Sequence, residues 1–314
     1  MSYEEEIQIY KGKYFFSNSQ GNKKTPVVIA FDLDETLGSF SDLETLWSSI
    51  HSFHPDKITI DFNKLLDLYP EFLRYGILPI LDFLYQKKKK GICDKIYIYT
   101  NNQCSPEWCK MIAKYFDYKL NISNDTITNK EMLSRSDGNS SISSLKTDKE
   151  LFDKIICAFK INNKIVEMGR TTHNKTHNDF IKCTVMPKKT RLCFVDNTYF
   201  NEMNNDNVYY IQPMSYFHHL STEIILDRFL GSELCRNSII ETEHYLFSDY
   251  LYMQFFKRGL FNKVHVSKKI LEIDVLVAQK MMYHIKEFFY LTHKKGRTKK
   301  IKYPIGRFTK KKRG

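Results

Sequence analysis

The sequence lacks long apolar runs, and this limits where the protein can reside. No stretch reaches the roughly 18 apolar residues that a membrane-spanning helix needs, so we expect no transmembrane segment. The N-terminal stretch MSYEEEIQIYKGKYF is acidic and has no apolar signal-peptide region. Both absences predict an intracellular protein, in the cytoplasm or nucleus of the cell that makes it or of its host.

Paired cysteines and nucleotide-binding loops are also missing. The seven cysteines are scattered, and Cys104 and Cys109 have no second pair at zinc-ligand spacing, so we expect reduced thiols. The chain has no internal repeat and no glycine-rich P-loop. Apolar residues make up 42% and charged residues 27%, which predicts a globular protein with a real hydrophobic core.

Acidic residues are absent from the stretch Lys294–Gly314, KKGRTKKIKYPIGRFTKKKRG. Its eleven Lys and Arg supply nearly all of the formal net charge of +12, so the rest of the chain is close to neutral. Such a run predicts nonspecific nucleic-acid binding through phosphate contacts, or else a tail that only solubilises the protein. Because Gly296, Pro304 and Gly306 interrupt the run, we expect a mobile tail without a long helix.

Three short segments rich in β-forming residues each end at a cluster of polar residues. They are VVIAF (Val27–Phe31), KIYIYT (Lys95–Thr100) and RLCFVD (Arg191–Asp196). Helix-like segments lie between them, and strands that alternate with helices predict an α/β fold with a parallel sheet. Ligands bind beyond the carboxyl ends of the strands in such sheets, so the three polar clusters are expected to converge on one site.

The order of these segments predicts the following organisation: an N-terminal arm (1–25), a core (26–230) with insertions at about 41–69 and 121–168, a helical extension (231–293) and the basic tail (294–314). In the extension, apolar residues recur at 270, 273, 277, 281, 285 and 288 behind Ser267, a candidate N-cap. This spacing predicts a helix whose apolar stripe packs on the core.

Two aspartates one residue apart, Asp32 and Asp34, follow the first strand in VVIAFDLDETLGSF. A strand followed by an Asx turn would explain a lone DxD. The longer string FDLDETL, however, resembles the first motif of the haloacid dehalogenase (HAD) superfamily, hhhDxDxT. The resemblance implies a HAD-like, Rossmann-type parallel sheet in which Asp32 is the nucleophile on phosphorus. Asp34 would protonate the leaving group and then activate water, while Thr36 would brace the loop and contact substrate.

The other two strand ends resemble further motifs of this superfamily. In IYIYTNNQ, Thr100 would donate its hydroxyl to a phosphate oxygen, with Asn101 as a neighbouring substrate contact. In LCFVDNTYF, Asp196 would bind the metal ion and Asn197 would contact substrate. The resemblance implies Mg²⁺ as the cofactor, with three protein ligands: the carboxylates of Asp32 and Asp196 and the main-chain carbonyl of Asp34.

A lysine is also needed to balance charge as phosphorus becomes pentacoordinate. The segment NKTHNDFIKC precedes the last predicted strand and offers Lys175, near the start of a short helix, with Lys182 as the alternative. His173 and His177 flank Lys175. They are expected to be loop residues or substrate contacts, because a carboxylate site favours hard cations over imidazole ligands.

Within the superfamily the chain is most similar to the small C-terminal-domain phosphatases, also called NLI-interacting-factor-like phosphatases. Their first motif reads DLDETL, LRYGILPILDFL (Leu73–Leu84) is similar to their RPG-containing segment, and VDNTYF is similar to their LDNSP. The resemblance implies a Mg²⁺-dependent phosphomonoesterase that forms an aspartyl phosphate and acts on phosphoserine or phosphothreonine in proteins.

Two alternatives to a protein phosphatase stay open. The basic tail suits a nucleic-acid end (3′-) phosphatase, and it also suits a non-catalytic nucleic-acid-binding protein built on a HAD core. A composition rich in Asn, Lys, Ile and Tyr suggests an AT-rich genome. Together with the basic C-terminus, it resembles proteins of large DNA viruses, which leaves packaging in a virion open.

Overall fold

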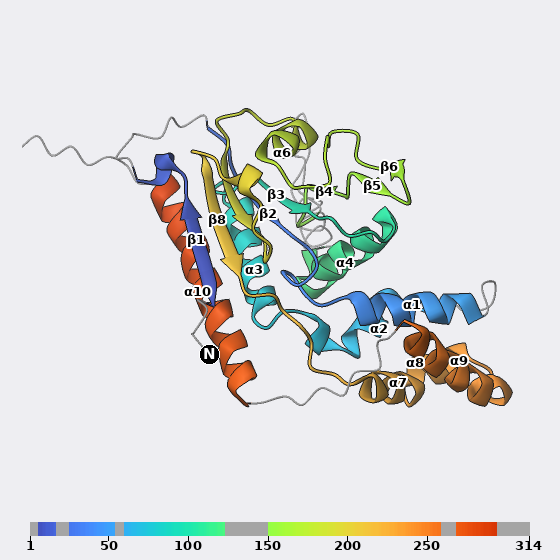
Figure 1. Ribbon diagram of the computed structural model, residues 1–314. Coiled ribbons are helices and arrows are strands. Elements are labelled where there is room, and N and C mark those ends of the chain that lie inside the picture. The colour runs from blue at the N-terminus through green and yellow to red at the C-terminus, as the bar shows by residue number, and fades with distance from the viewer. Residues whose placement is uncertain (1–5, 17–24, 54–59, 123–149, 259–267, 294–314) are drawn as a thin grey trace, which may run out of the picture.

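The computed structural model describes residues 6–16, 25–53, 60–122, 150–258 and 268–293. Its centre is a six-stranded sheet with helices on both faces, which confirms the predicted α/β class (Figure 1). The strands in spatial order are β1 (Ile7–Lys11), β8 (Val208–Pro213), β7 (Arg191–Val195), β2 (Val27–Phe31), β3 (Lys95–Tyr99) and β4 (Lys154–Ile156). All neighbours pair in parallel except β1, which runs antiparallel to β8.

The three strands predicted from sequence form the middle of this sheet as β2, β3 and β7. Every residue of β2 and of β7 is buried. A strand covered on both faces needs apolar residues at successive positions rather than at alternate ones. This explains the unbroken apolar residues of Val27–Phe31 and Leu192–Val195.

The order in which the chain visits the strands reverses at β2. From β2 the chain moves outward through β3 to β4, and it then returns to the other side of β2 to form β7 and β8. In open α/β sheets this reversal leaves a crevice beyond the carboxyl ends of the two strands at the switch point. Here those two strands are β2 and β7.

The two faces of the sheet bury separate clusters of side chains. Ile29 and Phe31 point to the larger cluster, which includes residues of α3 (Ile77–Lys89), α4 (Pro106–Lys119) and α10 (Lys268–His293). Val28 and Ala30 point to the smaller cluster, under α6 (His177–Thr184). Side chains alternate between the faces of a strand, so each strand supplies both cores.

The first predicted insertion folds as α1 (Ser41–Phe53) and α2 (Phe62–Asp67). Helix α1 contacts α9 (His244–Lys257). Helix α9 also contacts α7 (Thr222–Leu230), which in turn contacts α8 (Glu233–Ser238). Helix α2 contacts α4. Only the ends of the second insertion are described, and they include a hairpin of β5 (Lys160–Ile161) and β6 (Lys164–Ile165). Single 3-10 turns complete the described chain at Lys13–Phe15, Pro70–Phe72, Asn201–Met203 and Glu241–Glu243.

Both outer parts of the described chain join the core. β1, from the expected N-terminal arm, forms the sheet edge beside β8, and α10 lies along β8, β7 and β1 (Figure 1). Two ion pairs connect these parts: Lys11 with Glu287 at 2.7 Å and Lys280 with Glu6 at 2.5 Å.

The predicted apolar stripe of α10 is buried only in part. Val277, Met281, Ile285 and Phe288 pack in the core, whereas Ile270 is exposed. The candidate cap Ser267 and the basic tail from Lys294 onward lie outside the described residues. None of the helices in the described ranges combines the length and apolar composition that a membrane span requires.

The burial of α10 predicts that it stabilises the whole sheet. Ile285→Ala should lower the free energy of unfolding by about 2–5 kcal/mol, because it leaves a cavity at a fully buried position. The control Tyr290→Ala, on the exposed side of the same helix, should change it by less than about 0.5 kcal/mol. Urea unfolding measures both. Equal, small effects would mean that α10 is only loosely attached.

Candidate active site

Two aspartates lie side by side where the sheet ends at its switch point. Asp32 follows β2 and Asp196 follows β7, and each continues the hydrogen bonding of its strand for one residue. The Asp32 amide donates to the Val195 carbonyl at 2.9 Å, and the Asp196 amide donates to the Ile211 carbonyl at 3.1 Å. The sheet itself therefore fixes the backbone from which both carboxylates project.

The ammonium group of Lys175 joins these two carboxylates. It donates to Asp32 Oδ1 and, at 2.7 Å, to Asp196 Oδ2. Lys175 is only 2% exposed and immediately precedes Thr176, the N-cap of α6. Lys182, the alternative candidate, is exposed on α6. Of the two lysines, Lys175 is the one that reaches the aspartates.

The charges of this trio influence one another strongly. Burial disfavours the charged ammonium of Lys175, but the charges of Asp196 and Asp32 outweigh burial and raise its pKa. Burial raises the pKa of Asp196, and the Lys175 ammonium opposes that shift. Lys175 therefore stays protonated and holds two carboxylates close together that would otherwise repel each other.

The second aspartate of the motif, Asp34, has a different partner. Its Oδ2 accepts a hydrogen bond from Asn102 Nδ2 at 2.7 Å. The main-chain N–H of Asn102 in turn donates to Thr100 Oγ1 at 3.0 Å. The loop after β3 thus contributes Thr100 and Asn102 to the same site. Burial and the neighbouring charge of Asp32 raise the pKa of Asp34 to about 6. Asn102 had not been predicted as a site residue, although the polar string TNNQ contains it.

The turn after Asp34 is held in an unusual conformation. Glu35 has a φ of 59°, in the left-handed region that non-glycine residues rarely adopt. The buried guanidinium of Arg74 donates to the carbonyls of Glu35 and Thr36, the latter at 2.7 Å. A side chain at Gly38 could not fit, because its Cβ would lie 2.4 Å from the Phe72 carbonyl oxygen. The motif residues after Asp34 are thus fixed by contacts with the segment 72–74.

Thr36 and Asn197 bond to each other. The Thr36 hydroxyl donates to Asn197 Oδ1 at 2.9 Å and accepts a hydrogen bond from the main-chain N–H of Asn197 at 3.0 Å. The Asn197 side chain also donates to Glu35 and to Ser215, both at 3.0 Å. These contacts tie the loop after β7 to the loop after β2. Thr36 was expected to brace the loop and to contact substrate, and these hydrogen bonds support the first of the two roles.

Asn101 accepts a hydrogen bond from Arg170, a buried residue that the sequence had not pointed to. Arg170 Nη2 donates to Asn101 Oδ1 at 2.7 Å, and Nη1 donates to the Thr100 carbonyl at 3.0 Å. Its remaining contacts are main-chain carbonyls, including those of His173 and Asn174. Arg170 therefore connects the loop after β3 to the segment that carries Lys175.

A cleft of about 300 Å³ opens beside Asp34. Glu35 and Glu44 line it together with Trp108 and Phe217, and its described lining contains no Lys or Arg. Arg258, which is not among the lining residues, pairs with Glu44 at 2.6 Å. The cleft beside Asp34 therefore contains one further carboxylate, Glu35, without an ion-pair partner among the described residues, and has aromatic side chains on its walls.

Within the described residues, no three His, Cys, Asp or Glu side chains cluster closely enough to hold a metal ion by themselves. The ligand set implied by the HAD resemblance contains only two carboxylates, those of Asp32 and Asp196, plus the Asp34 carbonyl. Both carboxylates converge on one ammonium, so they already face a common cation. Hard anionic oxygens of this kind, completed by water, suit Mg²⁺.

Comparisons with known proteins assign this chain to no family. No family model matches the sequence, and no curated protein or solved structure matches it either. The site must therefore be interpreted from its own geometry.

The position of Lys175 predicts a large effect on stability. Lys175→Met should lower the free energy of unfolding by about 3–5 kcal/mol, because two buried carboxylates lose their shared counter-charge. Lys182→Met makes the same chemical change at an exposed position and should have little effect. Thermal and urea unfolding of both variants test this. A Lys175→Met protein as stable as the wild type would contradict the ion-pair geometry.

Proposed function

We propose that the protein is a phosphomonoesterase in which Asp32 forms a covalent aspartyl phosphate. The arrangement of Asp32, Lys175 and Asp196 at the switch point carries this proposal. Lys175 bonds one carboxylate oxygen of Asp32, Oδ1, and no described residue donates a hydrogen bond to Oδ2. One oxygen of the nucleophile is thus oriented while the other stays available for attack on phosphorus.

The reaction would proceed in two steps. Asp32 attacks phosphorus, the bond from phosphorus to the leaving oxygen breaks, and Asp34 gives that oxygen its proton. Asp34 then takes a proton from water, which attacks the aspartyl phosphate and releases inorganic phosphate and Asp32. The hydrogen bond from Asn102 orients Asp34 for both transfers. Lys175 and the Thr100 hydroxyl would stabilise the phosphoryl oxygens as charge builds on them.

Mg²⁺ would be held by the carboxylates of Asp32 and Asp196 and the main-chain carbonyl of Asp34. When bound, it neutralises part of the charge on the phosphoryl group. Lys175 contributes one positive charge, which is too little for two carboxylates and a phosphate dianion together. That deficit of positive charge supports a requirement for a divalent cation.

The acidic cleft beside Asp34 favours a protein substrate over a nucleic acid. A leaving group that enters this cleft meets Glu35, whose charge would repel the neighbouring phosphates of an oligonucleotide, whereas Arg258 balances the charge of Glu44. A phosphoserine or phosphothreonine segment with neutral or basic neighbours would not be repelled. In this proposal, nucleic-acid binding by Lys294–Gly314 would be separate from the chemistry.

The central test is removal of the nucleophile. Asp32→Asn should reduce turnover of an aryl phosphate by several orders of magnitude, because an amide cannot form the acyl phosphate. Asp82→Asn makes the same change on the exposed side of α3 and should keep full activity. Circular dichroism and thermal unfolding establish that both variants fold. Wild-type turnover in a folded Asp32→Asn protein would reject the assignment.

The same assay can separate the substrate classes. A panel of a phosphopeptide, a 3′-phosphorylated oligonucleotide, a sugar phosphate and an aryl phosphate should give the highest kcat/KM for the phosphopeptide. A preference for the oligonucleotide would leave the chemistry intact and overturn the substrate assignment.

Dependence on a metal ion is a further expectation. Activity should disappear in EDTA and return with Mg²⁺, and Asp196→Asn should raise the Mg²⁺ concentration required, because it removes one anionic ligand. Asp206→Asn, at an exposed carboxylate whose ion-pair partner is Lys13 and not a residue of the site, is the control. Titration of activity with Mg²⁺ measures the shift. Undiminished activity in chelator would point to a metal-free reaction.

A further inference from the structure

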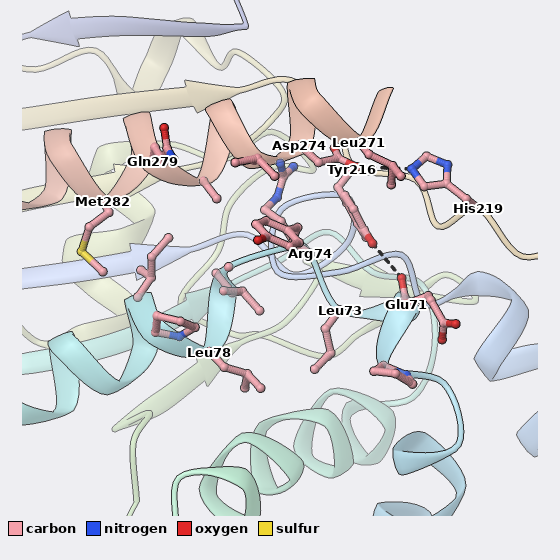
Figure 2. A pocket seen from close by; sticks show the side chains of 18 residues that line it. Glu71, Leu73, Arg74, Leu78, Tyr216, His219, Leu271, Asp274, Gln279 and Met282 are labelled. Atoms are coloured by element: carbon pink, nitrogen blue, oxygen red, sulfur yellow. Dashed lines mark hydrogen bonds and ion pairs between the residues drawn. The ribbon is translucent and has the colours of Figure 1, made fainter. Parts of the chain in front are cut away.

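A large cavity lies between α10 and the segment that leads from the turn Pro70–Phe72 into the start of α3 (Figure 2). Its volume is about 1030 Å³, and none of Asp32, Asp34, Lys175 or Asp196 lines it. Pockets that bind drug-sized ligands have volumes of roughly 300–1,000 Å³. This pocket is therefore large enough to hold a ligand of that size and is separate from the candidate active site.

Most of the pocket wall is apolar. Leu271, Val275, Ala278 and Met282 recur every three or four residues, so they share one face of α10. Figure 2 shows Leu271 and Met282 on the α10 side of the pocket and Leu78 on the α3 side. Protein interiors are normally packed without large voids. Two apolar helix faces separated by such a space are suited to an apolar ligand between them.

The two acidic groups in the wall have different partners. Glu71 pairs with the Arg228 guanidinium at 2.9 Å, whereas Asp274 lies 3.2 Å from Nε2 of His219, which balances its charge only when the imidazole is protonated. Arg74, in the same wall, forms no ion pair with a described residue. It is 3% exposed, and its hydrogen bonds all go to neutral main-chain carbonyls, those of Glu35, Thr36 and Met214.

Arg74 thus carries a charge that no ion pair balances. No carboxylate of the described residues lies within ion-pair distance of its guanidinium, and burial lowers the pKa of Arg74 to about 10, although the charge of Asp274 opposes that shift. Nη1 donates to none of the described residues, while Nε and Nη2 hold the three carbonyls. Figure 2 shows the Arg74 side chain among those that line the pocket, below Asp274. A buried, unbalanced guanidinium is a binding group for a carboxylate.

We propose that this pocket binds a small amphipathic carboxylate. Its apolar tail would lie between the faces of α3 and α10, and its carboxylate would accept hydrogen bonds from Arg74. The proposal does not rest on the proposed phosphatase activity, although Arg74 also holds the turn that follows Asp34.

Calorimetric titration with decanoate, below its micelle concentration, tests the proposal on the full chain. One saturable site is expected, and decylammonium, with the same tail and the opposite charge, should bind at least about tenfold more weakly, because a charge-assisted hydrogen bond is worth more than 1 kcal/mol. Val275→Trp should weaken binding at least about tenfold, because the larger indole takes up part of the space between the two helix faces. Tyr283→Trp, on an exposed part of α10 outside the lining, should leave the affinity unchanged.

Three results would overturn the proposal: no saturable binding of decanoate, equal binding of decylammonium, or an affinity for decanoate that Val275→Trp leaves unchanged. Should Val275→Trp fail to fold, Leu271→Trp at the half-exposed rim makes the same test. The Asp32→Asn variant should bind decanoate normally. Loss of phosphatase activity and loss of this site can therefore be told apart.

Discussion

One buried positive charge organises the candidate active site. Lys175 places its ammonium between Asp32 and Asp196, which come from adjacent strands and would repel each other without it. Removing three charged groups from water costs more free energy than their attraction commonly returns, so a stable fold alone gives no reason to keep them. A site that must bind a phosphate dianion does give such a reason. In the proposed reaction, the ammonium would bond phosphoryl oxygens and the carboxylates would bind a cation.

Two buried arginines extend this order to the surrounding loops. Arg74 and Arg170 bond mainly to main-chain carbonyls, and each connects a loop of the site to a distant segment. Main-chain contacts hold a loop in one conformation whatever side chains it carries. The loop after Asp34 and the loop after Thr100 are therefore held by residues that touch no predicted substrate atom. Substitutions at either arginine would displace Asp34 or Thr100 indirectly.

The central strands and the acidic motif residues could be read from the sequence because their signals are local. VVIAF, and LCFV after Arg191, are apolar runs that each lead into an aspartate, and a parallel sheet brings such ends together. The choice between Lys175 and Lys182 could not be made locally, since it depends on which side of α6 faces the sheet. Asn102 and Arg74 were missed for a related reason. Their partners lie 68 and 38 residues away along the chain, and no short-range pattern marks such pairs.

The pairing of β1 with β8, and the packing of α10 across both, has a consequence for how the chain folds. Residues near opposite ends of the chain meet at this edge, with Lys11 and Glu287 separated by 276 positions. During synthesis, β1 is made first but must wait for β8 and α10 before its edge is paired and covered. Contacts of such long range slow folding and leave apolar strand edges open in the meantime. Nascent chains of this protein are therefore expected to depend on chaperones until α10 has emerged from the ribosome.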